Sequence, residues 1–254
     1  MSLRTVAIAA ALAAIALPSQ AAISVTNSGF SYSQSFDSLA TTGTSNAFSL
    51  EGWTLSTATY RAGNGSSNTG AFYSFGSDGA TDRALGGVGS SGLASGYFAV
   101  AFKNDSGSTL SKVSLGFDGE QWRNGGSSTA NPGLAQAMVL QYGFGDTIGA
   151  VSWIAPGGSF NWSSPVFGTT AAAAVNGNTT GKVAGVGGDL GLNWAANQTL
   201  WVRWIEVNDP NNDHALAIDN FTITAVPEPS SYAMLLAGLG VVGLLARRRS
   251  NTRR

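Results

Sequence analysis

Between residues 22 and 225, short apolar runs alternate with segments that are rich in glycine, serine, threonine and asparagine. No part of this range has the sustained apolar stripe of an amphipathic helix, whereas alternation with a period of two recurs. From Val113 to Phe117 every second residue is apolar, which is typical of a strand with one solvent-facing side. The pattern predicts an all-β body, whose clearest strands are Gly96–Phe102, Leu110–Phe117, Ala137–Phe144, Leu200–Val207 and Ala215–Ala225.

Two segments depart from simple alternation. Leu200–Val207 is apolar on both faces, which predicts a central strand. Arg203 within that strand then needs a partner, because an unpaired buried charge is costly. Ala171–Gly188 has four successive alanines followed by asparagine, threonine and glycine, so we expect it to be the least ordered part of the body.

The last predicted strand changes phase. In Ala215–Ala225, the apolar side chains up to Ile218 and those from Phe221 onward have opposite parity. One extra residue would bring both sets onto the same face of the sheet. We therefore expect a β-bulge at Asp219-Asn220.

The first residues have the composition of a secretory signal peptide. Arg4 precedes an apolar stretch from Val6 to Leu17, and small residues follow it. Residues 1–21 are therefore predicted to form a signal-peptide helix, which signal peptidase removes by cutting between Ala21 and Ala22. Residues 22–225 then form one β domain, and residues 226–254 follow it as a tail.

Within this tail, an uncharged apolar run is followed by a basic block. Residues 231–246 carry no charge, and Arg247, Arg248 and Arg249 follow directly. The run is short for a hydrocarbon core of about 30 Å, but flanking residues extend it. A buried core helix is the usual alternative for so short a run. The basic end of the chain favours a transmembrane helix with a cytoplasmic tail.

The residues before this run carry a family resemblance. Pro227, Glu228 and Pro229, followed by the apolar run and the arginines, resemble the PEP-CTERM sorting signal. The prolines hold the segment extended, as they would also do in a plain helix stop and linker. The resemblance implies that a membrane-embedded exosortase recognises Pro-Glu-Pro and processes the tail. The body is then released or attached at the surface of a Gram-negative bacterium that makes exopolysaccharide.

A second resemblance concerns the body. Four segments resemble a jelly-roll-type domain found in PEP-CTERM proteins and in accessory regions of extracellular nucleases: Phe36–Trp53, Tyr73–Gly86, Gly119–Arg123 and Asp213–Thr224. The resemblance implies a β-sandwich without established chemistry. We therefore expect a single antiparallel, jelly-roll-like β-sandwich between the signal-peptide helix and the transmembrane helix.

Charge and composition exclude several classes of function. Residues 22–225 contain seven basic and thirteen acidic side chains, a net charge of −6, so nucleic acid is not an expected partner. The chain has no cysteine and one histidine, which excludes disulfides and a Cys/His zinc site. The stability of an exported body of this kind must come from its core, helped at most by a bound ion.

One set of residues combines charge with tryptophan, and it has two interpretations. As a functional site, it would be a polar cleft with aromatic platforms for a sugar. As a structural feature, it would be a salt bridge inside the sandwich with the tryptophans in the core, and we favour this interpretation. The set comprises Asp82, Arg83, Glu120, Trp122, Arg123, Trp201 and Arg203.

A second set of residues is a candidate calcium site. Asp209, Asn211 and Asp213 are spaced two residues apart, and Asp219 follows nearby. Calcium takes six to eight oxygen ligands, which such spacing can supply. His214 stands where an EF-type loop has glycine, however, so an Asx-rich turn is the commoner explanation. No other cofactor is indicated.

A glycosidase would need a pair of carboxyl groups, for which Glu120 and Glu206 are candidates. The Glu-x-Asp-x-Glu strand of jelly-roll glucanases is absent, because Asp118 and Glu120 are followed by Trp122. We therefore expect no enzymatic activity. The sequence indicates an exported, non-catalytic surface or matrix protein associated with exopolysaccharide. The alternatives are a cryptic extracellular glycan hydrolase and a structural matrix protein without a ligand.

Overall fold

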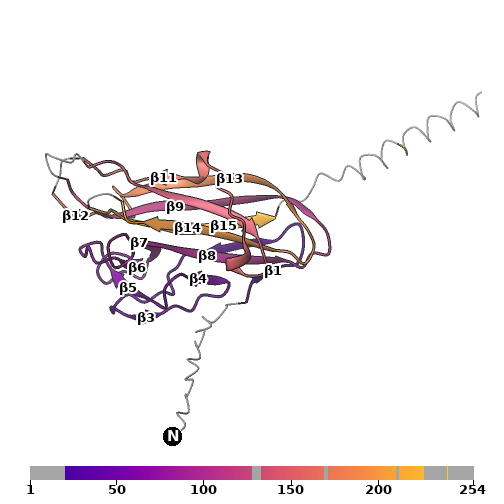
Figure 1. Ribbon diagram of the computed structural model, residues 1–254, viewed down its shortest axis with the longest axis horizontal. Helices are drawn as coiled ribbons and strands as arrows, with labels where there is room; N and C mark the ends of the chain where they lie inside the picture. Colours follow the sequence, from indigo (N-terminus) through magenta and orange to yellow (C-terminus); the bar gives the residue numbers. More distant parts are fainter. Residues whose placement is uncertain (1–20, 128–132, 169–170, 210–211, 226–238, 240–254) are drawn as a thin grey trace, which may run out of the picture.

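The computed structural model describes residues 21–127, 133–168, 171–209, 212–225 and 239. Two β-sheets pack against one another, which confirms the predicted all-β body (Figure 1). Helical structure between residues 21 and 225, where described, is confined to the short 3-10 turns η1 (Ile148–Ala150) and η2 (Gly158–Phe160). Apart from Ala21 and Leu239, the predicted signal-peptide and transmembrane helices lie outside the described residues. None of the described helices is long and apolar enough to cross a membrane.

The first sheet, called sheet one, has the strand order β1-β8-β14-β10-β11, with β4 beside β8. Because β14 lies between β8 and β10, the predicted central position of this strand is confirmed. The strands are β1 (Ile23–Val25), β4 (Trp53–Leu55), β8 (Ser95–Asn104), β10 (Ala137–Phe144), β11 (Trp162–Ser163) and β14 (Thr199–Val207).

The second sheet, called sheet two, has the order β12-β9-β15-β7-β6-β5-β3, with β13 beside β9 and β2 beside β15. Its two long central strands, β9 and β15, carry most of the residues considered below. The strands are β2 (Ser31–Gln34), β3 (Asn46–Ala47), β5 (Thr59–Gly63), β6 (Ala71–Phe75), β7 (Ala84–Val88), β9 (Leu110–Asn124), β12 (Ala173–Ala174), β13 (Lys182–Trp194) and β15 (Ala215–Ala225).

The five predicted strands are all present, as β8, β9, β10, β14 and β15, although β9 extends well past its predicted end. Two expectations need correction. The sandwich is not purely antiparallel, because β1 pairs with β8 and β5 pairs with β6 in parallel. The segment Ala171–Gly188 is not unstructured, since it contains β12 and the first half of β13. Positive φ angles at Gly185 and Gly187 let β13 stay paired with β9 despite its irregular composition.

Aromatic rings from both sheets meet in the space between them. Trp204 of β14 stacks on Trp53 of β4 and on Phe98 of β8, with ring centroids 5.9 and 5.4 Å apart. Phe221 of β15 approaches Trp204 edge-on from sheet two at 5.4 Å. All four side chains are fully buried. Stacked and edge-to-face aromatic pairs add to the hydrophobic contribution, so these rings fix how the two sheets face each other.

The predicted bulge in β15 is confirmed. The register of β15 against β9 shifts between Asp219 and Thr222, and Asn220 has a φ angle of 51°. Ile218 before the shift and Phe221 after it are both fully buried in the main core. The extra residue therefore lets both apolar sets face inward, while Asp219 and Asn220 are placed outside that core.

Replacing Gly86 of β7 with alanine is expected to destabilise the sandwich by about 1–3 kcal/mol or more. A Cβ atom at this position would lie 2.0 Å from the Leu216 carbonyl oxygen of β15. Urea unfolding of the purified chain measures the loss. Gly191→Ala in β13 is the matched control, because its Cβ meets nothing within 4 Å and should cost less than about 0.5 kcal/mol. Equal midpoints for the two variants would contradict the packing of β7 on β15.

Candidate functional site

The outer face of sheet two carries a second, smaller hydrophobic cluster. Tyr73, Phe75, Val88 and Trp122 are buried in it, together with alanines of β7 and β15. Phe75 stacks on Tyr73 with centroids 4.9 Å apart and on Trp122 with centroids 6.2 Å apart. The three rings thus form a continuous stack away from the main core.

Loops on either side enclose Trp122. Its backbone carbonyl accepts the backbone N–H of Val175 at 2.8 Å. A Cβ atom on Gly177 would lie 2.4 Å from the indole, so only glycine fits there. Trp122 is 2% exposed, and its indole Nε1–H donates to Glu120 Oε2 at 2.9 Å. Trp122 therefore belongs to the buried second cluster, and no ring face remains open for stacking on a sugar.

Glu120 and Asp219 form a buried acid pair on this outer face. The register pairs Glu120 with Ala217 and Asp118 with Asp219, so Glu120 and Asp219 are diagonal neighbours on adjacent strands. They are 1% and 3% exposed. Glu120 Oε1 and Asp219 Oδ1 are buried and have no hydrogen-bond partner. Such groups are uncommon in folded proteins, where most buried polar atoms are paired.

Both carboxyl groups of the acid pair have pKa values that are raised to near pH 7. Burial is the main cause that raises the pKa of Glu120 to about 7, and the negative charge of Asp219 adds to it. The hydrogen bond from Trp122 acts in the opposite direction. Burial also raises the pKa of Asp219 to about 7, and the charges of Asp82 and Asp37 act in the same direction. At neutral pH each carboxyl group is therefore partly protonated.

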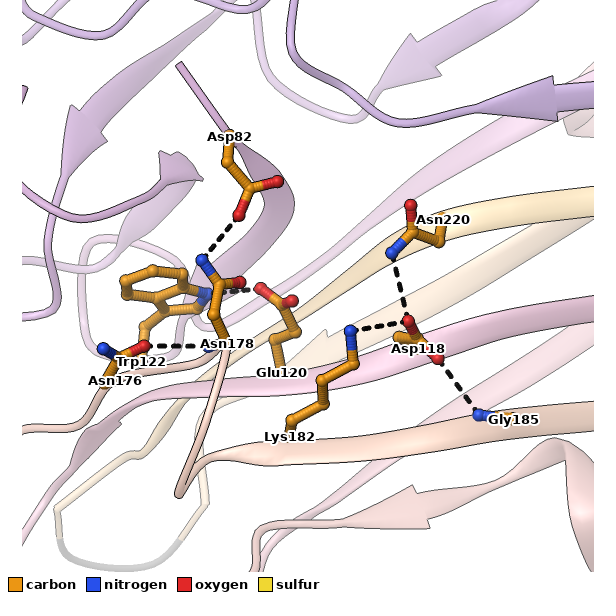
Figure 2. A network of polar contacts seen from close by, with 9 residues as sticks. All are labelled: Asp82, Asp118, Glu120, Trp122, Asn176, Asn178, Lys182, Gly185 and Asn220. Atoms are coloured by element: carbon orange, nitrogen blue, oxygen red, sulfur yellow. Dashed lines mark hydrogen bonds and ion pairs between the residues drawn. The ribbon is translucent and has the colours of Figure 1, made fainter. Parts of the chain in front are cut away.

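A polar network adjoins the acid pair (Figure 2). Asp118 Oδ2 accepts from Lys182 Nζ at 2.8 Å and from Asn220 Nδ2 at 3.0 Å, and its Oδ1 accepts from the Gly185 N–H. Burial opposes ionisation of Asp118, but these donors outweigh it and lower its pKa. Because Lys182 is engaged by Asp118, it does not neutralise the acid pair through a direct bond.

The loop before β13 binds another carboxylate of this region, Asp82, which precedes β7. Asn178 Nδ2 donates to Asp82 Oδ2 at 2.5 Å (Figure 2). Arg83, next to Asp82, is 2% exposed and points elsewhere. Its Nε donates to Ser74 Oγ at 2.8 Å, and its Nη2 donates to the Ser74 carbonyl. Burial lowers the pKa of Arg83, and its bonds hold β6 in place.

The two remaining arginines of the predicted set lie apart from Glu120. Arg123 Nη1 donates to the carbonyls of Gly65 and Ser66 at 3.1 and 3.0 Å. Arg203 lies in sheet one, where Gln141 Oε1 accepts from its Nε and Nη2 at 2.9 and 2.6 Å. Its predicted partner is therefore an amide.

Aromatic rings complete the surroundings of Arg203. Its guanidinium lies 3.8 Å from the ring centroid of Trp153 and 5.5 Å from that of Tyr97. Trp201, two residues before it, is 7% exposed and donates through Nε1 to the Gly145 carbonyl at 3.0 Å. Trp201 is thus buried, as the structural interpretation expects.

The expected salt bridge among these residues is wrong. Within the described ranges the ion pairs are Lys103–Asp105, Lys112–Asp189 and Lys182–Asp118, and none joins Glu120 to an arginine. The seven residues of the predicted set do not form a single cluster. β9 and β14 belong to different sheets, which separates Glu120, Trp122 and Arg123 from Trp201 and Arg203.

Of the candidate calcium site, the structure brings Asp209 and Asp213 together and places Asp219 in another cluster. Asp213 Oδ1 accepts the backbone N–H of Asp209 at 2.6 Å, as in an Asx-rich turn. Asn211 lies outside the described residues, and Asp219 belongs to the acid pair. In the part of the chain that the structure describes, no three acidic or histidine side chains are arranged to hold a metal ion.

Glu120 and Glu206, the two candidates for a glycosidase pair, lie on strands of different sheets. Glu206 lies on β14 in sheet one and is fully enclosed, and its carboxylate accepts the backbone N–H of Gly89. Burial, and then the charge of Asp213, raises the pKa of Glu206. Glu120 has Asp219 as its acidic neighbour, so the two glutamates belong to different clusters.

A polar hollow of about 220 Å³ lies at the end of β7 and β9. Asn68 and Asn212 are exposed at its rim, and Asp213 is buried in its wall. Arg123 and Ser90 also line it. Arg123 donates through Nη1 to the Gly65 and Ser66 carbonyls, and its Nε is buried without a hydrogen-bond partner and without access to solvent. Sequence reasoning identified Arg123 and Asp213 but assigned them to separate sites.

Several residues of these sites escaped the sequence analysis. To predict that Glu120 lies beside Asp219, one must know the register of β9 on β15. The predicted bulge was a local signal of that register. Asn178 and Asn68 lie in loops whose composition resembles that of any polar loop. No feature of their sequence marks the sites they approach.

Comparison with known families finds one match. Residues 225–249 match the PEP-CTERM protein-sorting motif, which confirms the resemblance seen in the sequence. This motif implies an exported protein that is processed by an exosortase. Comparison with curated proteins finds no match to the chain.

Glu120→Gln is expected to lessen the pH dependence of stability in metal-free buffer. The folded-state pKa of about 7 exceeds the ordinary 4.5, so the folded state binds the proton more tightly than the unfolded chain does. The resulting stabilisation is complete below pH 4.5 and is lost as the pH rises through about 7.

Urea unfolding at pH 5 and pH 8 measures this difference. The wild-type chain should lose about 3 kcal/mol more than the Glu120→Gln variant over this interval. Glu51→Gln, at an exposed glutamate, should retain the wild-type dependence. A Glu120→Gln profile as steep as that of the wild type would contradict the assignment.

Proposed function

We propose that this protein is an exported, non-catalytic component of the surface or extracellular matrix of a Gram-negative bacterium, and that its jelly-roll-like sandwich binds exopolysaccharide. Signal peptidase cuts between Ala21 and Ala22. The chain is then anchored through residues 231–246 until an exosortase acts near Pro227-Glu228-Pro229. The match of residues 225–249 to the sorting motif supports the processing step.

The polar hollow is the observation that supports polysaccharide binding. Sugar hydroxyls both donate and accept hydrogen bonds, so they need a mixed lining. Arg123 supplies a positive charge, Asp213 supplies a carboxylate, and Asn68 and Asn212 supply exposed amides at the rim. The volume of about 220 Å³ is below the ~300–1,000 Å³ usual for small-molecule sites. It suits one sugar unit of a branch or chain end.

The burial of the acidic groups supports a binding role over hydrolysis. A glycosidase needs two carboxyl groups on either side of the scissile bond, about 5–9 Å apart. Glu120 and Asp219 are 1% and 3% exposed, and Glu206 is 4% exposed. A polymer cannot reach groups enclosed to this extent without displacing the loops that cover them.

The double variant Asn68→Ala/Asn212→Ala is expected to lower affinity for the polysaccharide of the producing cells by about fivefold or more. It removes two exposed amides, and each lost hydrogen bond costs about 0.5–1.5 kcal/mol. Isothermal titration with fragments of that polysaccharide measures the loss. Asn193→Ala, at an exposed position on β13, should bind as the wild type does.

The same titration, together with an assay for reducing ends, distinguishes the two alternative functions. Release of reducing ends from the polysaccharide by the wild-type chain would favour the hydrolase. Absence of both binding and hydrolysis would favour the structural matrix protein. Equal affinity of the double variant and the wild type would show that the hollow is not part of the binding site.

Replacing Pro227-Glu228-Pro229 with three alanines is expected to block removal of the tail. The substitution removes both the carboxylate and the extended backbone that the prolines impose. Mass spectrometry of the protein from the producing cells should find the peptide after residue 229 only in the variant. The control Asn251→Ala, beyond the arginine block, should be processed normally. Wild-type processing of the alanine variant would contradict the role of the motif.

A further inference from the structure

We propose that Glu120 and Asp219 bind a divalent cation, Ca²⁺ in the extracellular medium, at the outer face of sheet two. This site is different from the sequence-predicted one, because it shares only Asp219 with it. It is also independent of the polar hollow and of the proposed polysaccharide.

The geometry supplies oxygen atoms without donors. Glu120 Oε1 and Asp219 Oδ1 are both buried, and neither accepts a hydrogen bond. They project from adjacent strands at diagonal positions, which lie about 7–8 Å apart between Cα atoms and within reach of side chains. One cation between the two carboxylates would satisfy both oxygen atoms at once.

The charges around the pair leave a negative excess. The negative charges of Asp82 and Asp37 repel the carboxylate of Asp219, and the charge of Asp82 also repels that of Glu120. Lys182 of β13, whose positive charge acts on both carboxyl groups, forms its ion pair with Asp118 at 2.8 Å. Arg83 donates to Ser74 on β6. Neither basic side chain is directly bonded to the acid pair.

The loop before β13 offers one further oxygen ligand. Asn178 uses its Nδ2 to bind Asp82, whose charge acts on both members of the acid pair, and this leaves the amide oxygen of Asn178 available. Ca²⁺ accepts a mixture of carboxylate, amide and water oxygens with flexible geometry. With two carboxylates instead of the three or more of a tight site, the expected Kd is about 10⁻⁴–10⁻³ M, the range of extracellular calcium modules.

A cation here would link β9 to β15 and to the loop that carries Asn178. The chain has no cysteine, so no disulfide can do this. The competing way to satisfy the pair is a single shared proton, with one carboxyl donating to the other. These two occupants predict opposite responses to calcium, and this makes the proposal testable.

Thermal unfolding of the full-length chain in non-ionic detergent at pH 7.5 provides the test. After treatment with a chelator, 10 mM CaCl₂ should raise the Tm of the wild type by roughly 3–6 °C. Glu120→Gln and Asp219→Asn should each abolish this rise. Asp189→Asn, which removes an exposed carboxylate from β13 in the same sheet, should retain it.

Terbium luminescence provides a second measurement that needs no variant. Tb³⁺ replaces Ca²⁺ at oxygen sites, and Trp122, bonded to Glu120, is placed to sensitise its emission. We expect saturable emission with one ion per chain, displaced by millimolar CaCl₂. An unchanged wild-type Tm together with absent or calcium-insensitive emission would overturn the proposal in favour of the shared proton. A calcium-induced rise that persists in both acid-pair variants would overturn it in favour of another site.

Discussion

The register of β15 against β9 is the constraint on which the rest of the structure depends. The core between the sheets requires both Ile218 and Phe221 to face inward, and three residues of simple alternation cannot achieve this. The bulge resolves the conflict by inserting one residue. Its consequence is chemical, because Asp219 is placed diagonally opposite Glu120 and Asn220 beside Asp118. A requirement of packing on one face thus creates the acid pair on the other.

The aromatic stack explains why Glu120 of the acid pair is buried and has a raised pKa. Trp122 follows Glu120 by two residues, so both project from the same face of β9. The loop around Gly177 closes over the indole, and the same closure excludes water from Glu120. The single bond from Trp122 does not compensate for this loss of solvent, and the pKa of Glu120 therefore rises. A hydrophobic cluster outside the main core makes these carboxyl groups sensitive to protons and cations.

A feature could be predicted from the sequence where its signal lay within one continuous segment. The alternating strands, the bulge and the sorting motif are each contained in a continuous segment, and each was predicted correctly. β13 was missed because glycines at positive φ interrupt its alternation. The set around Glu120 was divided wrongly for another reason. Whether Arg203 and Glu120 share a face depends on which sheet each strand joins, and this depends on pairings across about a hundred residues.

β15 also relates the polar hollow to the acid pair, because Asp213 lies two residues before the strand begins and Asp219 lies at its bulge. Six residues of strand at about 3.3 Å each separate them by roughly 20 Å. At that separation two unit charges interact by less than about 1 kcal/mol at an effective dielectric constant of about 20. The register of a single strand therefore positions both sites with only weak electrostatic coupling between them. Occupancy of the acid pair can stabilise the sandwich while the hollow keeps its own affinity.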